Sequence, residues 1–281
     1  MPKKRSNNYE ANLRKIAEMC LFDNCFMNAC FKNCPEFAEH ILRIILDKPG
    51  LQVENVVVED SYTNLQGHSS RLDIVAHDEA GRLMNIEVQR DDEYAIPKRA
   101  RYYSSLLDSY SLDKGEPYDK LRDSYVIFIT EHDYFCEQLP IYHIDRMIRE
   151  TGKDFRDGSF IIYVNGENRN DTPLGKLMHD FACAKPGDMH YNVIADRTRM
   201  FKESKEGIEY MSKVLDDLRA EERAAGRKEG KLEGINDNKK DVASRMLSFE
   251  KYALNEIATI SGLSLAEVKA LQAELSTSAN A

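Results

Sequence analysis

The chain has 281 residues, of which 42% are hydrophobic, and its 39 Lys plus Arg against 48 Asp plus Glu give a formal net charge of −9. A content of 14 Tyr and 11 Phe is enough to fill a core, which excludes an unfolded chain, and no apolar run approaches the roughly 20 residues of a membrane helix. The acidic balance disfavours nucleic acid binding unless basic residues are locally concentrated.

The N-terminal third predicts a helix followed by strands. Residues 10–47 have apolar residues at 3.6-residue spacing, and Pro49-Gly50 ends this pattern. Three segments rich in β-branched or apolar residues then read as strands: 53–59, 71–77 and 83–89. The turn residues at 78–81 make the last two strands a hairpin.

The middle of the chain alternates between helical and strand patterns. Pro97 opens a helix over 98–110. Further strands are predicted at 125–130 and 160–164, with a short strand and helix between them in 141–150, and helices at 174–181 and from 191 onwards. This order predicts a mixed α/β core.

The composition changes after this core. Residues 202–251 hold 12 basic and 12 acidic residues, which is typical of a solvated helical linker. Within it, glycines recur every four residues, at Gly226, Gly230 and Gly234, and indicate either a frayed linker or a close helix–helix approach. Residues 252–275 form two short helices, and the second begins with a capping box at Ser264-x-x-Glu267.

The predicted hairpin contains the candidate metal-binding and catalytic residues. Glu87 and Gln89 are two apart and share one face of a strand, and Asp73 opposes the aliphatic face of its own strand. Two carboxylates brought together repel each other unless a cation lies between them. Oxygen ligands in small number suit Mg²⁺ or Mn²⁺. The alternative from spacing alone is a pair of solvated acidic residues at strand ends.

These residues resemble a known family. Asp73, then Glu87-Val-Gln89, then the helix at 98–107 resemble the PD-(D/E)XK nuclease superfamily, and more specifically the PD-(D/E)XK nuclease family transposases related to recombination-promoting nucleases. Flanking blocks agree with this resemblance: 26–32, 126–131, 139–143, 161–166 and 177–181. The similarity covers about residues 20–215.

The resemblance implies a restriction-endonuclease-like α/β fold, a mixed β-sheet core flanked by helices. It implies that Asp73 and Glu87 bind the metal, with Gln89 at the position where the superfamily name has Lys. An acidic residue of the first helix often completes such sites. Glu39 is the candidate and Glu36 the runner-up, with ordinary surface exposure as the alternative for both.

The helix after the hairpin offers contacts to a phosphate. Arg99 and Tyr103 lie four residues apart, and a guanidinium matches a phosphate bidentately. Packing in the core is the alternative for the tyrosine. Arg90, Lys98 and Arg101 add a local concentration of positive charge.

The predicted organisation has four parts: an N-terminal segment at 1–19, a nuclease-like domain at 20–201, a charged helical linker at 202–251 and a helix-turn-helix-like C-terminal module at 252–281. The second helix of this module offers more acidic than basic residues. We therefore favour a packing or oligomerisation role over DNA binding.

Together these features predict a Mg²⁺- or Mn²⁺-dependent DNA endonuclease of mobile-element type. The competing hypothesis is a catalytically degenerate DNA-binding or protein-interaction module. A homodimer is favoured if both DNA strands are cut, and the lack of a Walker-type loop or GxGxxG argues against a nucleotide cofactor. Six sparse Cys and no hydrophobic segment behind the basic N-terminus favour a cytoplasmic protein. His179-Asp180 has no assignable role.

Overall fold

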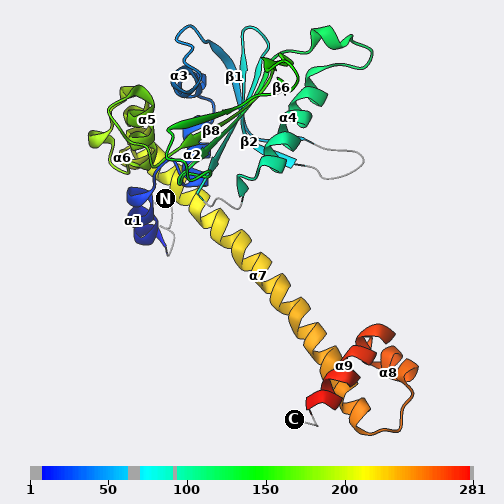
Figure 1. Cartoon of the computed structure of the whole chain (residues 1–281). Helices are drawn as coiled ribbons and strands as arrows, with labels where there is room; N and C mark the ends of the chain where they lie inside the picture. Colours follow the sequence, from blue (N-terminus) through cyan, green and yellow to red (C-terminus); the bar gives the residue numbers. More distant parts are fainter. Residues whose placement is uncertain (1–7, 63–69, 91–93, 279–281) are drawn as a thin grey trace. The chain divides into compact units, whose positions relative to one another are not determined.

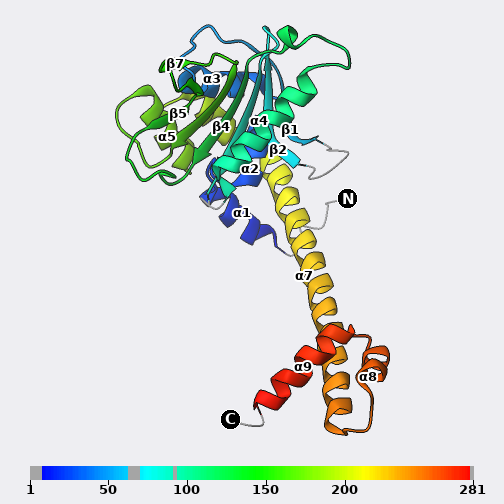
Figure 2. The ribbon, with the colours of Figure 1, turned by 45° about the vertical axis from the view of Figure 1, so that its right-hand side comes forward.

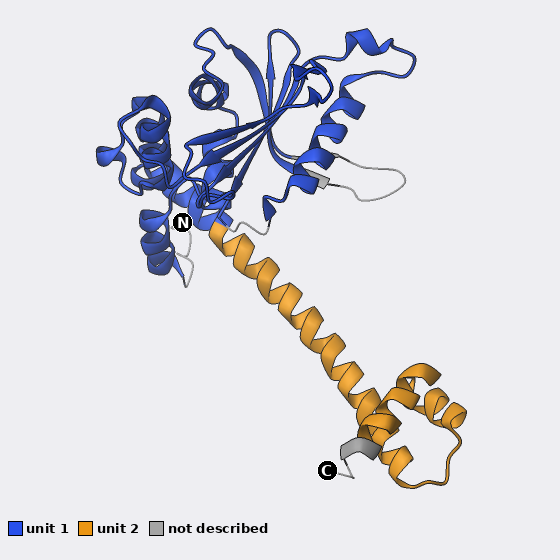
Figure 3. Ribbon diagram, viewed as in Figure 1, with its two compact units in different colours: residues 1–214 blue, residues 215–281 orange. Residues whose placement is uncertain are grey.

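The computed structural model describes residues 8–62, 70–90 and 94–278. The basic N-terminus noted above lies outside these ranges. The chain divides into two compact units, residues 1–214 and residues 215–281 (Figure 3). The division falls within a helix, α7 (Lys205–Ser248).

The first unit is built on a mixed six-stranded sheet in the order β1-β2-β3-β4-β8-β5 (Figure 1). Its strands are β1 (Val53–Tyr62), β2 (Ser70–Asp78), β3 (Leu83–Gln89), β4 (Ser124–Thr130), β5 (Ile141–Ile144) and β8 (Ser159–Asn165). The first three are antiparallel, β3, β4 and β8 are parallel, and β5 returns antiparallel to β8. The predicted α/β fold and its five predicted strands are confirmed.

Helices cover both faces of this sheet. One face packs against α4 (Pro97–Ser111), and α2 (Asn24–Phe31) and α3 (Pro35–Ile45) lie on the other (Figures 1 and 2). Leu106 and Leu107 of α4 are buried in one cluster with Phe128 of β4 and Tyr163 of β8. The sheet is therefore buried on both faces, as expected for parallel central strands.

The single helix predicted over 10–47 is wrong. The structure has three helices there, α1 (Tyr9–Glu18), α2 and α3. The Asp23 carboxylate accepts the backbone N–H of Cys20 at 2.9 Å and occupies the position before α2, so the chain turns at this residue. Pro35 then opens α3 at a position where its missing N–H costs nothing.

The helix predicted within 141–150 is also wrong. Extended backbone continues there, with β5 followed by β6 (Met147–Ile148), which pairs antiparallel with β7 (Lys153–Asp154). The helices predicted at 174–181 and from 191 onwards are confirmed, since α5 (Pro173–Ala182) and α6 (Asn192–Glu203) match them. The described residues of this unit also include the short 3-10 helices η2 (Tyr118–Lys120) and η3 (Pro186–Asp188).

Two cations of α6 hold the ends of other helices. The Arg197 guanidinium donates to the carbonyls of Ala29, Cys30 and Lys32 at the end of α2. The Lys202 ammonium donates to the carbonyls of Ala17, Met19 and Ala184, which lie at the ends of α1 and α5. Carbonyls at helix C-termini have no partner within the helix, so these cations satisfy them and fit the helix dipole.

The second unit contains the end of α7, α8 (Leu254–Ser261) and α9 (Leu265–Ser278). Its buried core consists of Ala243, Met246, Ile257 and Val268. The predicted capping box is confirmed, because the Ser264 side chain accepts the Glu267 N–H at 3.3 Å while Glu267 accepts the Ser264 N–H at 2.7 Å.

The glycine repeat of α7 has open space around it. A Cβ added at Gly226, Gly230 or Gly234 would meet nothing within 4 Å. Within the described part of the chain, the repeat therefore supports no close helix approach. Among the described helices, none combines the length and the apolar character that crossing a membrane requires.

Candidate functional site

The hairpin of β2 and β3 brings the predicted carboxylates together. Ile74 pairs with Ile86 across the two antiparallel strands, so Asp73 and Glu87 are the next opposed positions. Alternation along each strand turns both side chains to the face that α4 covers, whereas the two isoleucines point to the opposite face. The predicted hairpin therefore brings Asp73 and Glu87 together, with the Asp73 backbone N–H bonded to Glu87.

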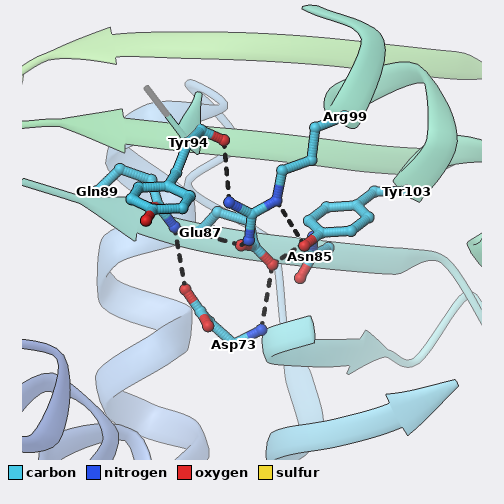
Figure 4. A network of polar contacts seen from close by, with 7 residues as sticks. All are labelled: Asp73, Asn85, Glu87, Gln89, Tyr94, Arg99 and Tyr103. Atoms are coloured by element: carbon cyan, nitrogen blue, oxygen red, sulfur yellow. Dashed lines mark hydrogen bonds and ion pairs between the residues drawn. The ribbon is translucent and has the colours of Figure 1, made fainter. Parts of the chain in front are cut away.

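Glu87 is fully buried and receives four hydrogen bonds (Figure 4). Its Oε1 accepts the Asp73 backbone N–H and the Asn85 amide, both at 3.1 Å. Its Oε2 accepts the Gln89 amide at 3.4 Å and an Arg99 N–H at 3.1 Å. The carboxylate is thus held in one orientation by its neighbours.

Burial nevertheless makes the charge on Glu87 unfavourable. Loss of solvation and repulsion from Asp73 raise the pKa of Glu87 to about 8, although the hydrogen bonds and the Arg99 charge act in the opposite direction. At neutral pH this carboxyl therefore holds a proton more readily than an ordinary glutamate. A carboxyl of this kind takes up a cation in exchange for a proton.

Gln89 links the two carboxyl groups. Its amide nitrogen lies 3.3 Å from Oδ2 of Asp73 and 3.4 Å from Oε2 of Glu87. A lysine at this position would add one positive charge between the two carboxyl groups, whereas the neutral amide adds none. A bound cation would therefore stabilise the Asp73 and Glu87 carboxyl groups more than it would if a lysine stood at position 89.

Arg99 and Tyr103 form a second layer over Glu87. Arg99 donates through Nε to the Tyr103 hydroxyl at 2.6 Å and through Nη1 to the Tyr94 carbonyl at 3.0 Å. Its side chain keeps 25% exposure, whereas Tyr103 keeps 4%. Arg99 is therefore placed to reach a substrate, but Tyr103 is a core residue that positions Arg99. The sequence prediction did not give the Arg99–Glu87 ion pair.

An open, polar cleft of about 380 Å³ lies at this site. Besides Asp73, Gln89 and Arg99, Asp23 and Asn24 at the start of α2 line it. Asp23 also accepts a hydrogen bond from Arg90 at 3.3 Å, and Arg90 pairs with Glu131 at 2.8 Å. Asp23 was not predicted as a site residue, because one continuous helix was expected over this region. The sequence feature that could have indicated it is an acidic residue directly before the largely apolar stretch 25–31.

The structure does not bring Glu39 into this cluster. Its carboxylate accepts the Val53 N–H at 3.0 Å and pairs with Arg43 at 2.7 Å. Val53 pairs with Asp78, at the opposite end of β2 from Asp73. Glu36 is not there either, since its carboxylate lies beside the Cys34 thiol. Both acids belong to α3, whereas the acid that reaches the cleft precedes α2.

The residues of the cleft fit a hard divalent cation. Asp73 and the adjoining buried Glu87 offer the carboxylate oxygens that Mg²⁺ and Mn²⁺ prefer, and Asp23 lines the same cleft. Burial first, and then repulsion from Asp73, raises the pKa of Glu87, although the Arg99 charge acts in the opposite direction. Among the described residues, Asn85 also keeps a buried side-chain oxygen without a hydrogen-bond partner. Positive charge beside Asp73 would offset the repulsion between the two carboxyl groups.

A mixed sheet with an antiparallel hairpin feeding parallel strands, and two carboxylates at the hairpin end beneath a basic helix, defines a restriction-endonuclease-like nuclease fold. The family model described as PD-(D/E)XK nuclease family transposase matches residues 40–245, and the chain belongs to this family. No significant match was found among curated proteins or among solved structures.

Proposed function

We propose that the protein is a DNA endonuclease that depends on Mg²⁺ or Mn²⁺, with Asp73 and Glu87 as the metal ligands. The observation that carries this proposal is the buried Glu87 carboxyl beside Asp73, with its pKa raised to about 8. A fold that buries one acid against another loses stability unless a cation joins them. When bound, the ion supplies Lewis acidity toward a phosphodiester and a nucleophilic water.

The remaining residues of the cleft orient the reactants. The Gln89 amide, which bridges the two carboxyl groups, donates to the attacking water or to a phosphate oxygen once a cation occupies those carboxylates. Arg99 holds Glu87 in place and presents its partly exposed guanidinium to the DNA backbone. Tyr103 keeps Arg99 in this position through its hydroxyl.

The DNA would approach over α4, where Lys98 and Arg101 are exposed. The two arginines of the cleft, Arg90 and Arg99, are already paired with carboxylates, so little positive charge remains there without the metal. We therefore expect weak DNA binding that depends strongly on metal and on salt. Tight DNA binding by metal-free protein would contradict this account.

Nicking of supercoiled plasmid tests the proposal. Wild-type protein with Mg²⁺ or Mn²⁺ should convert the plasmid to open-circular form, and Asp73→Asn or Glu87→Gln should abolish this conversion. Glu54→Gln is the matched control, because Glu54 is an exposed acid on β1, in the same sheet. Undiminished nicking by folded Asp73→Asn protein would overturn the assignment.

The same assay distinguishes an active endonuclease from the competing hypothesis, a catalytically degenerate module. Gln89 does not by itself favour that hypothesis, although a neutral amide stands where the superfamily name has Lys. A degenerate module would bind DNA or divalent metal without cutting in any of these conditions. Cleavage that requires both Asp73 and Glu87 would exclude it.

A further inference from the structure

A second group of metal-ligating side chains lies away from the nuclease cleft. His179 and Asp180 are on α5, and His190 lies just before α6. Figure 1 labels both helices. Each of the three offers a ligand atom, and these atoms all lie within 4.8 Å of one another. The cleft, by contrast, is lined from α2, β2, β3 and α4.

Asp180 is the fixed member of this group. It is fully buried, and its carboxylate accepts the His190 N–H at 2.8 and 3.0 Å and the Tyr191 N–H at 2.8 Å. These bonds tie the segment before α6 to α5. They also place the His190 side chain next to that of His179, with ring centroids 4.6 Å apart.

The two imidazoles are accessible, unlike the carboxylate. The His179 side chain is 37% exposed and His190 is also exposed. Nδ1 of His179 lies 3.1 Å from Oδ1 of Asp180. Zinc binds imidazole nitrogen at about 2.0–2.1 Å and carboxylate oxygen at about 2.0–2.2 Å, which places two ligands of a tetrahedral site roughly 3.3 Å apart. The observed pair is close to that spacing before any side chain moves.

We propose that His179, Asp180 and His190 bind Zn²⁺ or a similar borderline transition-metal ion, with one coordination position left to water. Two imidazoles and one carboxylate oxygen favour such an ion over Mg²⁺, which prefers oxygen ligands alone. The ligand atoms would be Nδ1 of His179, Oδ1 of Asp180 and a ring nitrogen of the exposed His190. The site joins α5 to the start of α6 and is distinct from the proposed nuclease metal.

Cobalt titration of the full-length, tag-free protein tests this proposal. The protein carries Asp73→Asn and Glu87→Gln and is kept in excess Mg²⁺, so that the cleft does not contribute. One Co²⁺ per chain should bind with the visible absorption of a low-coordinate site, and Zn²⁺ should displace it. His179→Gln or His190→Gln should each weaken Co²⁺ binding by at least about tenfold.

His132→Gln is the matched control and should leave Co²⁺ binding unchanged, because His132 is an exposed histidine outside this group, with its ring 3.0 Å from Glu167. His190→Gln should keep the fold, since the backbone of His190, not its ring, binds Asp180. Zn²⁺ should also raise the melting temperature of the parent protein but not of this variant. The proposal is overturned if Co²⁺ does not bind, or if it binds equally well to both histidine variants and the parent.

Discussion

Replacing the buried Glu87 carboxyl by an amide should change how stability depends on pH. In metal-free protein the pKa of Glu87 is raised to about 8 from an ordinary value of 4.5, by burial and by repulsion from Asp73. The folded state therefore binds a proton at Glu87 more tightly than the unfolded state does. Its contribution to stability is fully present below pH 4.5 and is lost as the pH rises through 8.

The size of this effect follows from the two pKa values. At about 1.36 kcal/mol per pKa unit, the rise from 4.5 to about 8 corresponds to a loss of at most about 5 kcal/mol by pH 9. Glu87→Gln cannot ionise and should not lose it. The amide NH₂ of the new side chain faces hydrogen-bond donors, which lowers the free energy of unfolding by the same amount at every pH. The plot of the variant's free energy of unfolding against pH is therefore displaced as a whole without a change in its pH dependence.

Urea unfolding in EDTA at several pH values from 5 to 9 measures this difference. The free energy of unfolding of Glu87→Gln minus that of wild type should increase steadily over this range. The exposed control Glu54→Gln should run parallel to wild type. Parallel curves for Glu87→Gln and wild type would show that Glu87 titrates like an ordinary glutamate, and the argument for a cation site would then fail.

Four further predictions concern other contacts. Gln89→Ala should slow metal-dependent nicking by about 100-fold while leaving Mn²⁺ binding in place, since one oriented donor is removed; loss of Mn²⁺ binding would refute its role as a donor to the reactants. Lys202→Met should lower the free energy of unfolding by about 2–3 kcal/mol, because three helix-end carbonyls lose a charged donor; an unchanged urea midpoint would contradict the capping role. Ser264→Ala should destabilise α9 by about 1 kcal/mol, measured as faster amide hydrogen exchange at the start of that helix. Substituting Lys98 and Arg101 together by Ala should reduce the slope of log affinity for DNA against log salt by about 2 in the presence of Mn²⁺, and an unchanged slope would place the DNA elsewhere.

The hairpin and its two acids were predictable because they rest on local rules. Alternation along 71–77 and 83–89, with a turn between them, determines which side chains share a face and which positions oppose one another. Asp73, Glu87 and Gln89 therefore converge as the sequence pattern indicated. Pro97 similarly marked the start of α4.

The rest of the site depends on tertiary packing. Helical periodicity indicates the face on which Glu39 lies, but not that α3 sets this residue beside Val53, at the far end of β2 from Asp73. Asp23 reaches the cleft only because the chain breaks between α1 and α2, where the apolar pattern continues without interruption. The ion pair of Arg99 with Glu87 joins a helix to a strand, and no local pattern encodes such a pairing.

The central claim is that Asp73 and Glu87 hold a divalent cation. Electron paramagnetic resonance of a Mn²⁺ titration at pH 8 counts the bound ions directly. Wild type and His179→Gln should each bind Mn²⁺ in the cleft, and the Asp73→Asn, Glu87→Gln double variant should lose it. Equal Mn²⁺ binding by the folded double variant and by wild type would contradict the account.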